Sequence, residues 1–119
     1  MKKHSFKVPS GASIAFTELG FGSAPLGNLY RAHSEKDAQA TFEAAWKAGI
    51  RYYDTAPLYG LGLSETRLNH FLRGQPPDIH VLSTKLGRLL EVCQRSPPPG
   101  PATLFAAPCR AGLVYAHPV

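Results

Sequence analysis

The sequence predicts an α/β fold built on a parallel sheet, and the order of its segments carries this prediction. Three short apolar segments, 19–22, 50–54 and 80–84, have the length and composition of strands. Between them, 34–48 and 64–73 carry apolar residues at helical spacing. An alternation of strand and helix is typical of βαβ units. Because such crossovers are right-handed, both helices should lie on one side of the sheet.

A small β-hairpin is expected ahead of the parallel sheet. Residues Ser5–Val8 and Ser13–Phe16 flank the turn-forming cluster Pro9–Gly11. The first strand of the sheet, Leu19–Gly22, follows this hairpin. A loop over 23–33 then leads to the first helix.

The first helix has a start signal and a stop signal. Ser34 is a suitable N-cap, and Asp37, three residues later, can complete a capping box. Gly49 is placed to end the helix as a left-handed glycine after the C-cap. The expected buried face comprises Ala38, Phe42 and Ala45, with Trp46 beside them.

The second helix is expected to begin at Ser64 as its N-cap and to end at Gly74. Pro76 and Pro77 prevent it from resuming. Its expected buried stripe comprises Leu68, Phe71 and Leu72. The third strand, 80–84, has an apolar centre at Val81 and Leu82.

Three chemically active side chains follow the second and third strands. Asp54 closes the second strand, Tyr59 lies in the loop after it, and Lys85 follows the third strand. The carboxyl ends of parallel strands share one face, where the catalytic groups of barrels gather. A phenol is a weak acid at neutral pH, but a neighbouring ammonium favours its ionised form. We therefore predict that Lys85 tunes Tyr59 as a proton donor and that Asp54 anchors Lys85.

These residues occur in a pattern that resembles the aldo-keto reductases. The pattern is Asp-Thr-Ala-x-x-Tyr-Gly over 54–60, then Ser64-Glu65, then a strand ending in Thr84-Lys85. Segment 19–28 resembles the first barrel strand of the branch that oxidises sugars and pyridoxal. The resemblance covers roughly residues 5–90. It implies a (β/α)₈ barrel, a nicotinamide cofactor (NADP or NAD) and a catalytic set of Asp, Tyr, Lys and His.

The resemblance also implies a place for the cofactor. Gly22, Ser23 and Ala24, together with Asp54, would lie against its nicotinamide end. Small residues allow the backbone to approach a ligand closely. Without the resemblance, the same three residues form a tight turn between a strand and a loop, and this alternative stays open. The implied partner is a small-molecule carbonyl or alcohol substrate, and the choice between NADP and NAD is undecided.

The length of the chain sets a limit on this barrel. A complete (β/α)₈ barrel takes about 250 residues, whereas this chain has 119. We therefore expect a partial barrel over residues 1–90, with about three βα units. The fourth catalytic residue of the family, a histidine, follows its fourth strand. His117 has a similar spacing from Lys85, but no helical pattern lies between them.

The composition changes after about Leu90. Of the 11 prolines, six lie beyond this residue, as do both cysteines. We expect residues 91–119 to form an irregular Pro-rich tail. Two origins stay open for this tail: a non-native end, such as a frameshifted one, and a genuine substrate loop followed by truncation.

Composition argues against several classes of protein. The formal net charge is +5, but the basic residues are scattered, which argues against a nucleic-acid-binding face. No apolar run approaches the about 20 residues of a membrane span. Two cysteines outside any paired motif predict neither a metal site nor a disulfide framework. Without the apolar core of a signal peptide near its start, the chain is expected to be cytoplasmic.

The expected parent function is NAD(P)-dependent oxidoreduction of a sugar-like or pyridoxal-like carbonyl/alcohol pair. We expect this function in an incomplete chain that is inactive alone. Two alternatives to it stay open: a non-catalytic fragment and a reductase-like interaction subunit that has lost turnover. The sequence predicts no oligomeric state.

Overall fold

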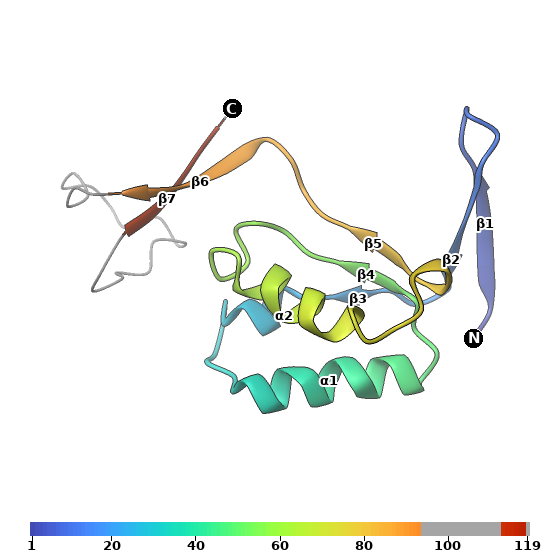
Figure 1. Ribbon diagram of the computed structural model, residues 1–119, viewed down its shortest axis with the longest axis horizontal. Coiled ribbons are helices and arrows are strands. Elements are labelled where there is room, and N and C mark those ends of the chain that lie inside the picture. Colours follow the sequence, from blue (N-terminus) through green and yellow to red (C-terminus); the bar gives the residue numbers. More distant parts are fainter. Residues whose placement is uncertain (94–112, 119) are drawn as a thin grey trace.

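A computed structural model describes residues 1–93 and 113–118 of the chain (Figure 1). A three-stranded parallel sheet lies beside two α-helices, and a two-stranded hairpin precedes them. The hairpin consists of β1, Lys3–Lys7, and β2, Ser13–Thr17. The parallel strands are β3, Phe21–Gly22, β4, Tyr52–Asp54, and β5, Val81–Ser83. The helices are α1, Glu35–Lys47, and α2, Leu63–Leu72, with short 3₁₀ turns η1 at Ala24–Gly27 and η2 at Pro77–Ile79.

The parallel sheet has the order β3-β4-β5, so the strands are neighbours in the order of the sequence. Gly22 pairs with Asp54, which pairs with Ser83. This arrangement confirms the predicted strand–helix–strand–helix–strand order, although each strand is shorter than expected. No helix follows β5 within the described residues, so the structure contains two complete βα units and a third strand. Its sheet does not close into a barrel.

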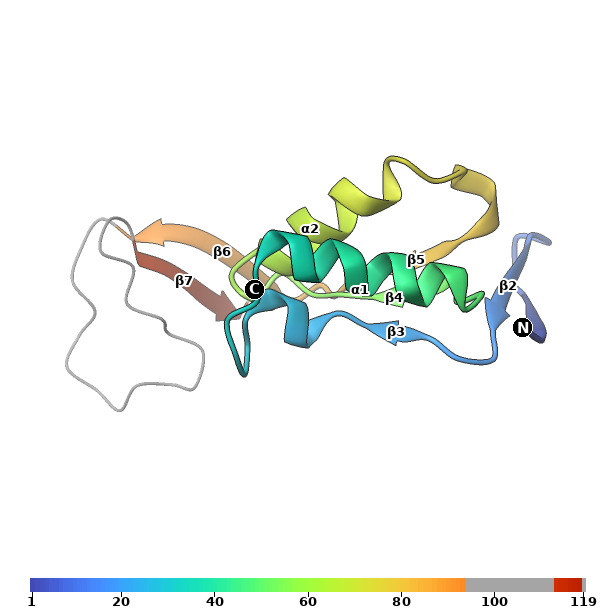
Figure 2. The ribbon, with the colours of Figure 1, turned by 90° about the horizontal axis from the view of Figure 1, so that it is seen from below.

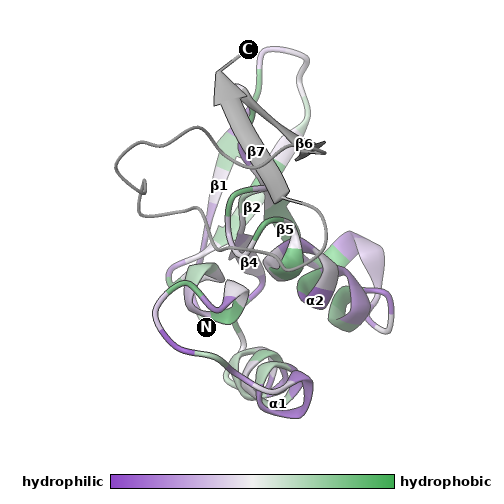
Figure 3. Cartoon of the chain, turned by 90° about the vertical axis from the view of Figure 1, so that its left-hand side faces the viewer, coloured by the Kyte–Doolittle hydropathy of each residue, from purple (hydrophilic) through white to green (hydrophobic). Residues whose placement is uncertain are grey.

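Both helices lie on the same side of the sheet (Figures 1 and 2). They bury an aromatic core against it, in which Phe42 lies 5.3 Å from Phe21 and 5.5 Å from Phe71 between ring centroids. The buried core comprises Leu26, Ala38, Phe42, Tyr53, Leu68, Phe71 and Leu72. Hydropathy colouring shows hydrophilic and hydrophobic residues on different sides of the helices (Figure 3). The predicted buried stripes of both helices are therefore confirmed.

The ends of α1 follow the predicted capping signals. The Ser34 hydroxyl accepts the Asp37 amide at 3.1 Å and donates to the Asp37 carboxylate at 2.7 Å. Gly49 has a φ of 92° after the C-cap, and its amide donates to the Trp46 carbonyl. The Ile50 amide donates to the Ala45 carbonyl, which completes a Schellman motif.

The start of α2 differs from the prediction. The helix begins at Leu63, and Gly62, with a φ of 91°, occupies the N-cap in place of Ser64. Ser64 is fully buried in the first turn, and its hydroxyl contacts Ser23 and Thr55. A small hydroxyl fits this interior position because the end of β3 supplies polar partners for it.

The tail also differs from the prediction in part. Residues Arg88–Cys93 form β6 and Leu113–Pro118 form β7, which pair antiparallel. The apolar, β-forming composition of 113–115 suits a strand, and Pro118 lies at the end of the ladder, where a missing amide costs little. The Pro-rich run 97–101 and Cys109 lie outside the described residues. His117 pairs with Leu89 in this hairpin, outside the parallel sheet.

Among the helices that the structure describes, none is long and apolar enough to cross a membrane. The described residues also contain no cluster of three or more His, Cys, Asp or Glu side chains that could hold a metal ion.

The aromatic core predicts a large stability effect at its centre. Phe42 is fully buried, so Phe42→Ala should lower the free energy of unfolding by about 3–5 kcal/mol. Urea unfolding followed by Trp46 fluorescence measures this loss. Phe6→Ala is the matched control, because Phe6 is 61% exposed on the hairpin. A loss below about 1 kcal/mol for Phe42→Ala would contradict the described core.

Candidate active site

The carboxyl ends of β4 and β5 bring three predicted residues together. Asp54 is the last residue of β4, and Lys85 follows β5 by two residues. Tyr59 lies in the loop that joins β4 to α2. Strand alternation aims Tyr53 at the helices and Asp54 at the opposite face of the sheet. The core residue Tyr53 and the site residue Asp54 therefore lie next to each other in β4, on opposite faces of the sheet.

An ion pair joins Asp54 to Lys85. The Lys85 Nζ donates to Asp54 Oδ2 at 2.7 Å and to the Thr55 carbonyl at 3.0 Å. Asp54 Oδ1 accepts the Ser83 hydroxyl at 2.7 Å. The Lys85 ammonium, with a smaller effect from Ser83, lowers the pKa of Asp54. Both carboxylate oxygens are therefore engaged, which fixes the carboxylate beneath the lysine.

The same lysine lies against the catalytic tyrosine candidate. Its Nζ is 5.1 Å from the centroid of the Tyr59 ring, within the range of a cation–π contact. The Asp54 carboxylate, followed by the Tyr59 hydroxyl, raises the pKa of Lys85. The positively charged Lys85 side chain therefore lies between a carboxylate and a phenol.

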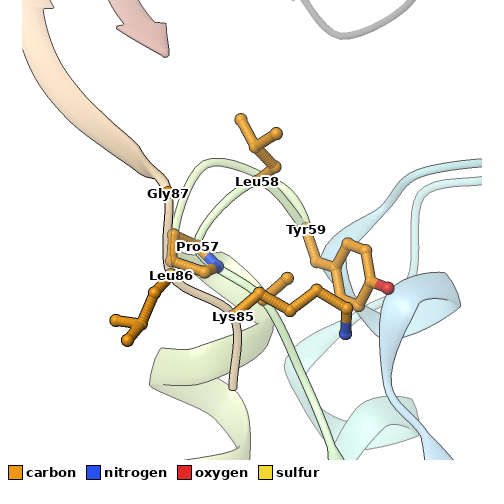
Figure 4. Close-up of a pocket in the computed structure, with 7 residues that line it drawn as sticks. Pro57, Leu58, Tyr59, Lys85, Leu86 and Gly87 are labelled. Carbon is orange, nitrogen blue, oxygen red and sulfur yellow. The ribbon is translucent and has the colours of Figure 1, made fainter. Parts of the chain in front are cut away.

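A pocket of about 250 Å³ opens at this point of the sheet. Figure 4 shows the Lys85 side chain running toward Tyr59, whereas Leu58 and Leu86 point away from that pair. The lining residues are Ala56, Pro57, Leu58, Tyr59, Lys85, Leu86 and Gly87. One end of the pocket is thus polar and charged, and the rest is apolar, a combination typical of small-molecule sites.

The three residues predicted to meet the cofactor lie in different environments. A side chain added at Gly22 would meet no atom within 4 Å, so there is free space beside Asp54. Ser23 is fully buried, and its amide and hydroxyl both donate to the Asp54 carbonyl, at 2.9 and 2.8 Å. Ala24 is half-buried at the start of η1. Gly22 therefore leaves open space next to the site, whereas the Ser23 side chain is enclosed.

A buried cluster of hydroxyls beneath the site was not predicted. The Ser64 Oγ lies 2.7 Å from Ser23 Oγ and 3.0 Å from Thr55 Oγ1. The Thr55 amide also donates to the Ser83 carbonyl. The cluster ties together the ends of β3 and β4 and the start of α2. The three hydroxyl residues are separated in the sequence, so no local pattern predicts that they meet.

Glu65 has two favourable contacts. It is an acid in the first turn of α2, where it complements the helix dipole. Its carboxylate also accepts the Thr84 hydroxyl at 2.7 Å. Because Thr84 precedes Lys85, this hydrogen bond ties α2 to the segment that carries the lysine.

The ion pair predicts a specific titration. Lys85→Met should raise the pKa of Asp54, because it removes the main group that lowers it. A ¹³C-carboxyl NMR titration of Asp54 measures the change. Lys36→Met, which removes an exposed lysine on α1, is the matched control and should leave the Asp54 titration unchanged. An unchanged pKa in Lys85→Met would contradict the described geometry.

The sign of the pH dependence follows from both shifts. The Asp54 contribution is fully present above its ordinary pKa of 3.8 and is lost as pH falls through the lowered value. The Lys85 contribution is present below its ordinary pKa of 10.5 and is lost as pH rises through the raised value. The stability difference between the parent chain and Lys85→Met should therefore shrink at both extremes. Because both side chains are partly exposed, this difference should be small throughout.

The chain is similar to dehydrogenases of known activity. It is 60% identical over 81 residues to a D-threo-aldose 1-dehydrogenase of Pseudomonas sp, matching 68% of this chain and 25% of that protein. It is 49% identical over 90 residues to a pyridoxal 4-dehydrogenase of Microbacterium luteolum, matching 74% of this chain and 26% of that protein. The chain thus spans about a quarter of the length of these relatives.

Solved structures show the same relationship in three dimensions. An aldo-keto reductase of Bacillus halodurans in its holo form aligns with a TM-score of 0.58 and 30% identity, over 76% of this chain and 28% of that one. A glycerol dehydrogenase of Gluconobacter oxydans aligns with a TM-score of 0.60 and 22% identity, over 97% of this chain and 30% of that one, and supports the fold alone. The sequence profile of the aldo/keto reductase family matches residues 18–103. The chain therefore belongs to the aldo/keto reductase family.

Proposed function

We propose that this chain supplies the proton-transfer groups of an NAD(P)-dependent oxidoreductase that acts on a small carbonyl/alcohol pair. The observation that carries the proposal is the position of the Lys85 ammonium, 2.7 Å from the Asp54 carboxylate and 5.1 Å from the Tyr59 ring centroid. The pocket opens at this pair. We propose that Asp54, Tyr59 and Lys85 act together as a catalytic set.

Each residue has one role in this proposal. In reduction, Tyr59 gives its hydroxyl proton to the carbonyl oxygen of the substrate, and in oxidation it accepts the proton of the alcohol. Lys85 stabilises the phenolate that proton donation leaves behind, because its positive charge lies against the ring. Asp54 holds the ammonium in place and keeps it charged.

Open space at Gly22 supports a place for the cofactor at one end of the site. Gly22 pairs with Asp54 in the sheet, and the space beside it is free of other atoms. We propose that the backbone at Gly22 and Ala24, together with Asp54, contacts the nicotinamide end. Ser23 shapes this edge from within, since its hydroxyl and amide are already bonded to Asp54. When bound, NADP or NAD supplies or accepts the hydride.

The substrate class follows from the relatives and the pocket together. The named relatives act on an aldose and on pyridoxal. The pocket here combines a charged end with apolar walls at Pro57 and Leu58. We infer a sugar-like or pyridoxal-like substrate whose reacting oxygen faces Tyr59.

A second function has support from the open sheet. Strands β3 and β5 are the edges of the described three-stranded sheet, and each has one neighbour in it. An open edge can pair with another chain. The second candidate is therefore a non-catalytic fragment or a reductase-like subunit that acts through such pairing.

Tyr59→Phe tests the catalytic assignment. Residues 1–90 are joined to the C-terminal part of a related reductase, and turnover and cofactor affinity are measured. Tyr59→Phe should lower kcat by about 10²–10⁴-fold and leave the dissociation constant of the cofactor unchanged, because it removes a proton donor and little else. Tyr30→Phe is the matched control, since Tyr30 is 80% exposed. Near-normal turnover in Tyr59→Phe would refute the assignment.

Assays of the 119-residue chain alone test whether it is an enzyme by itself. We expect no turnover with NADP or NAD and a panel of sugars and pyridoxal. Positioning of the reactants supplies about 7–11 kcal/mol of a barrier, and the cofactor contacts proposed here are limited to Gly22, Ala24 and Asp54. Isothermal calorimetry with each cofactor accompanies the assay. Turnover that disappears in Tyr59→Phe would make the chain an enzyme by itself and would exclude the fragment alternative.

A further inference from the structure

The loop that carries Tyr59 rests, backbone against backbone, on the end of η1. A Cβ atom added at Gly27 would lie 2.5 Å from the carbonyl carbon of Tyr59 and 2.6 Å from its carbonyl oxygen. A Cβ atom added at Gly60 would collide with the Gly27 carbonyl. Gly60 also has a φ of +67°. Two glycines are therefore required where the two segments touch, and the peptide that follows Tyr59 lies in this contact.

Local hydrogen bonds set the shape of the Tyr59 loop but not its height above the sheet. The Tyr59 amide donates to the Ala56 carbonyl at 3.0 Å, and the Tyr59 carbonyl accepts the Ser64 amide at 3.1 Å. These bonds join the loop to itself and to the first turn of α2. The Gly27 contact comes instead from a segment 32 or 33 residues earlier in the chain, on the far side of α1 in the sequence.

Arg67 on α2 holds the segment that contains Gly27. Its Nη1 donates to the Leu26 carbonyl at 2.6 Å and to Asn28 Oδ1 at 3.1 Å. Its Nη2 donates to the His33 carbonyl at 2.8 Å, and its Nε to Glu35 Oε2 at 2.9 Å. The guanidinium therefore bonds to residues on both sides of Gly27.

The burial of Arg67 makes this arrangement rigid. Its side chain is 6% exposed, and a charged group at such a depth is costly unless it is paired. The Glu35 carboxylate supplies the opposite charge, and the Arg67 guanidinium lowers the pKa of Glu35. The planar guanidinium donates from three nitrogens in fixed directions, whereas a lysine donates from a single nitrogen.

We propose that Gly27 and Arg67 are positioning residues for Tyr59: the Arg67 clamp fixes η1, and the Gly27–Gly60 contact then sets the distance from the Tyr59 ring to the Lys85 ammonium. Only the naming of Tyr59 as proton donor rests on the proposed function. If Gly27 and Arg67 served packing alone, their variants would change stability and leave the Tyr59–Lys85 contact as it is.

Fluorine NMR on the 119-residue chain tests this coupling without cofactor or substrate. The five tyrosines are labelled as 3-fluorotyrosine, and Tyr59→Phe identifies the Tyr59 resonance. Lys85→Met should shift this resonance in the parent chain, because it removes a charge 5.1 Å from the ring centroid. In Gly27→Ala and in Arg67→Lys, the same Lys85→Met change should shift the resonance by less than half as much.

A matched glycine variant controls for the added methyl group. Gly74→Ala introduces a Cβ with an ordinary contact of 3.6 Å, so it should retain the full Lys85-dependent shift. Arg67→Lys keeps a positive charge near Glu35 and carries the test if Gly27→Ala does not fold. A full shift in a folded Gly27→Ala or Arg67→Lys chain would overturn the proposal. Unfolding of both variants would overturn it as well, because the two residues would then determine folding and not position.

The fluorine NMR experiment and the turnover assay of Tyr59→Phe can fail independently of each other. Loss of the Lys85-dependent shift concerns geometry alone, whereas turnover in Tyr59→Phe concerns the proton donor. Normal turnover in Tyr59→Phe together with a reduced shift in Gly27→Ala would leave the positioning intact and remove its catalytic meaning.

Discussion

The two-residue period of strand β4 is the constraint on which the rest of the structure depends. Tyr53 points to the helices and is fully buried against Phe42 and Phe71. Its neighbour Asp54 must then point to the opposite face, where Lys85 meets it. A shift of the strand by one residue would expose the core tyrosine and bury the site acid. The three-residue strand β4 therefore fixes both the packing of the core and the position of the Asp54 carboxylate.

The site is tied to the helix layer by polar contacts that cross the sheet edge. Ser64 in α2 reaches Ser23 and Thr55 at the ends of two strands, and Glu65 reaches Thr84. The hydroxyls of Ser23, Thr55 and Ser64 are buried, so each would be costly without its partner. The position of the site thus depends on the register of α2 as well as on the strands.

Features that depend on neighbouring residues could be predicted from the sequence. The Ser34 cap, the Gly49 stop and the buried stripe of α1 follow from spacings of a few residues, and all three are confirmed. The positions of Asp54 and Lys85 at strand ends follow from the strand–helix order. The predicted start of α2 was wrong. A Ser–Glu pair resembles a helix cap, but Ser64 is buried in the first turn, where its hydroxyl bonds to Ser23 at the end of β3.

Features that depend on residues far apart could not be predicted in this way. Arg67 bonds to Leu26 across 41 positions, and no local pattern marks an arginine that will be buried. Leu82 was expected at an apolar strand centre, yet it is 51% exposed, since no helix after β5 covers it among the described residues. Strands β6 and β7 lie on either side of a Pro-rich run, and the composition of that run led to the prediction of an irregular tail in place of their pairing.

The glycine contact beneath Tyr59 has a consequence for how this pocket could be redesigned. Neither Gly27 nor Gly60 offers a side chain to exchange, so the floor of the loop cannot be altered gradually by substitution. Leu58 and Leu86 line the same pocket but point away from the charged pair (Figure 4). Changes of size and polarity at these two positions would leave Tyr59 and Lys85 in place. Under the proposed function, substrate range and acid–base chemistry are therefore separable traits of this small surface.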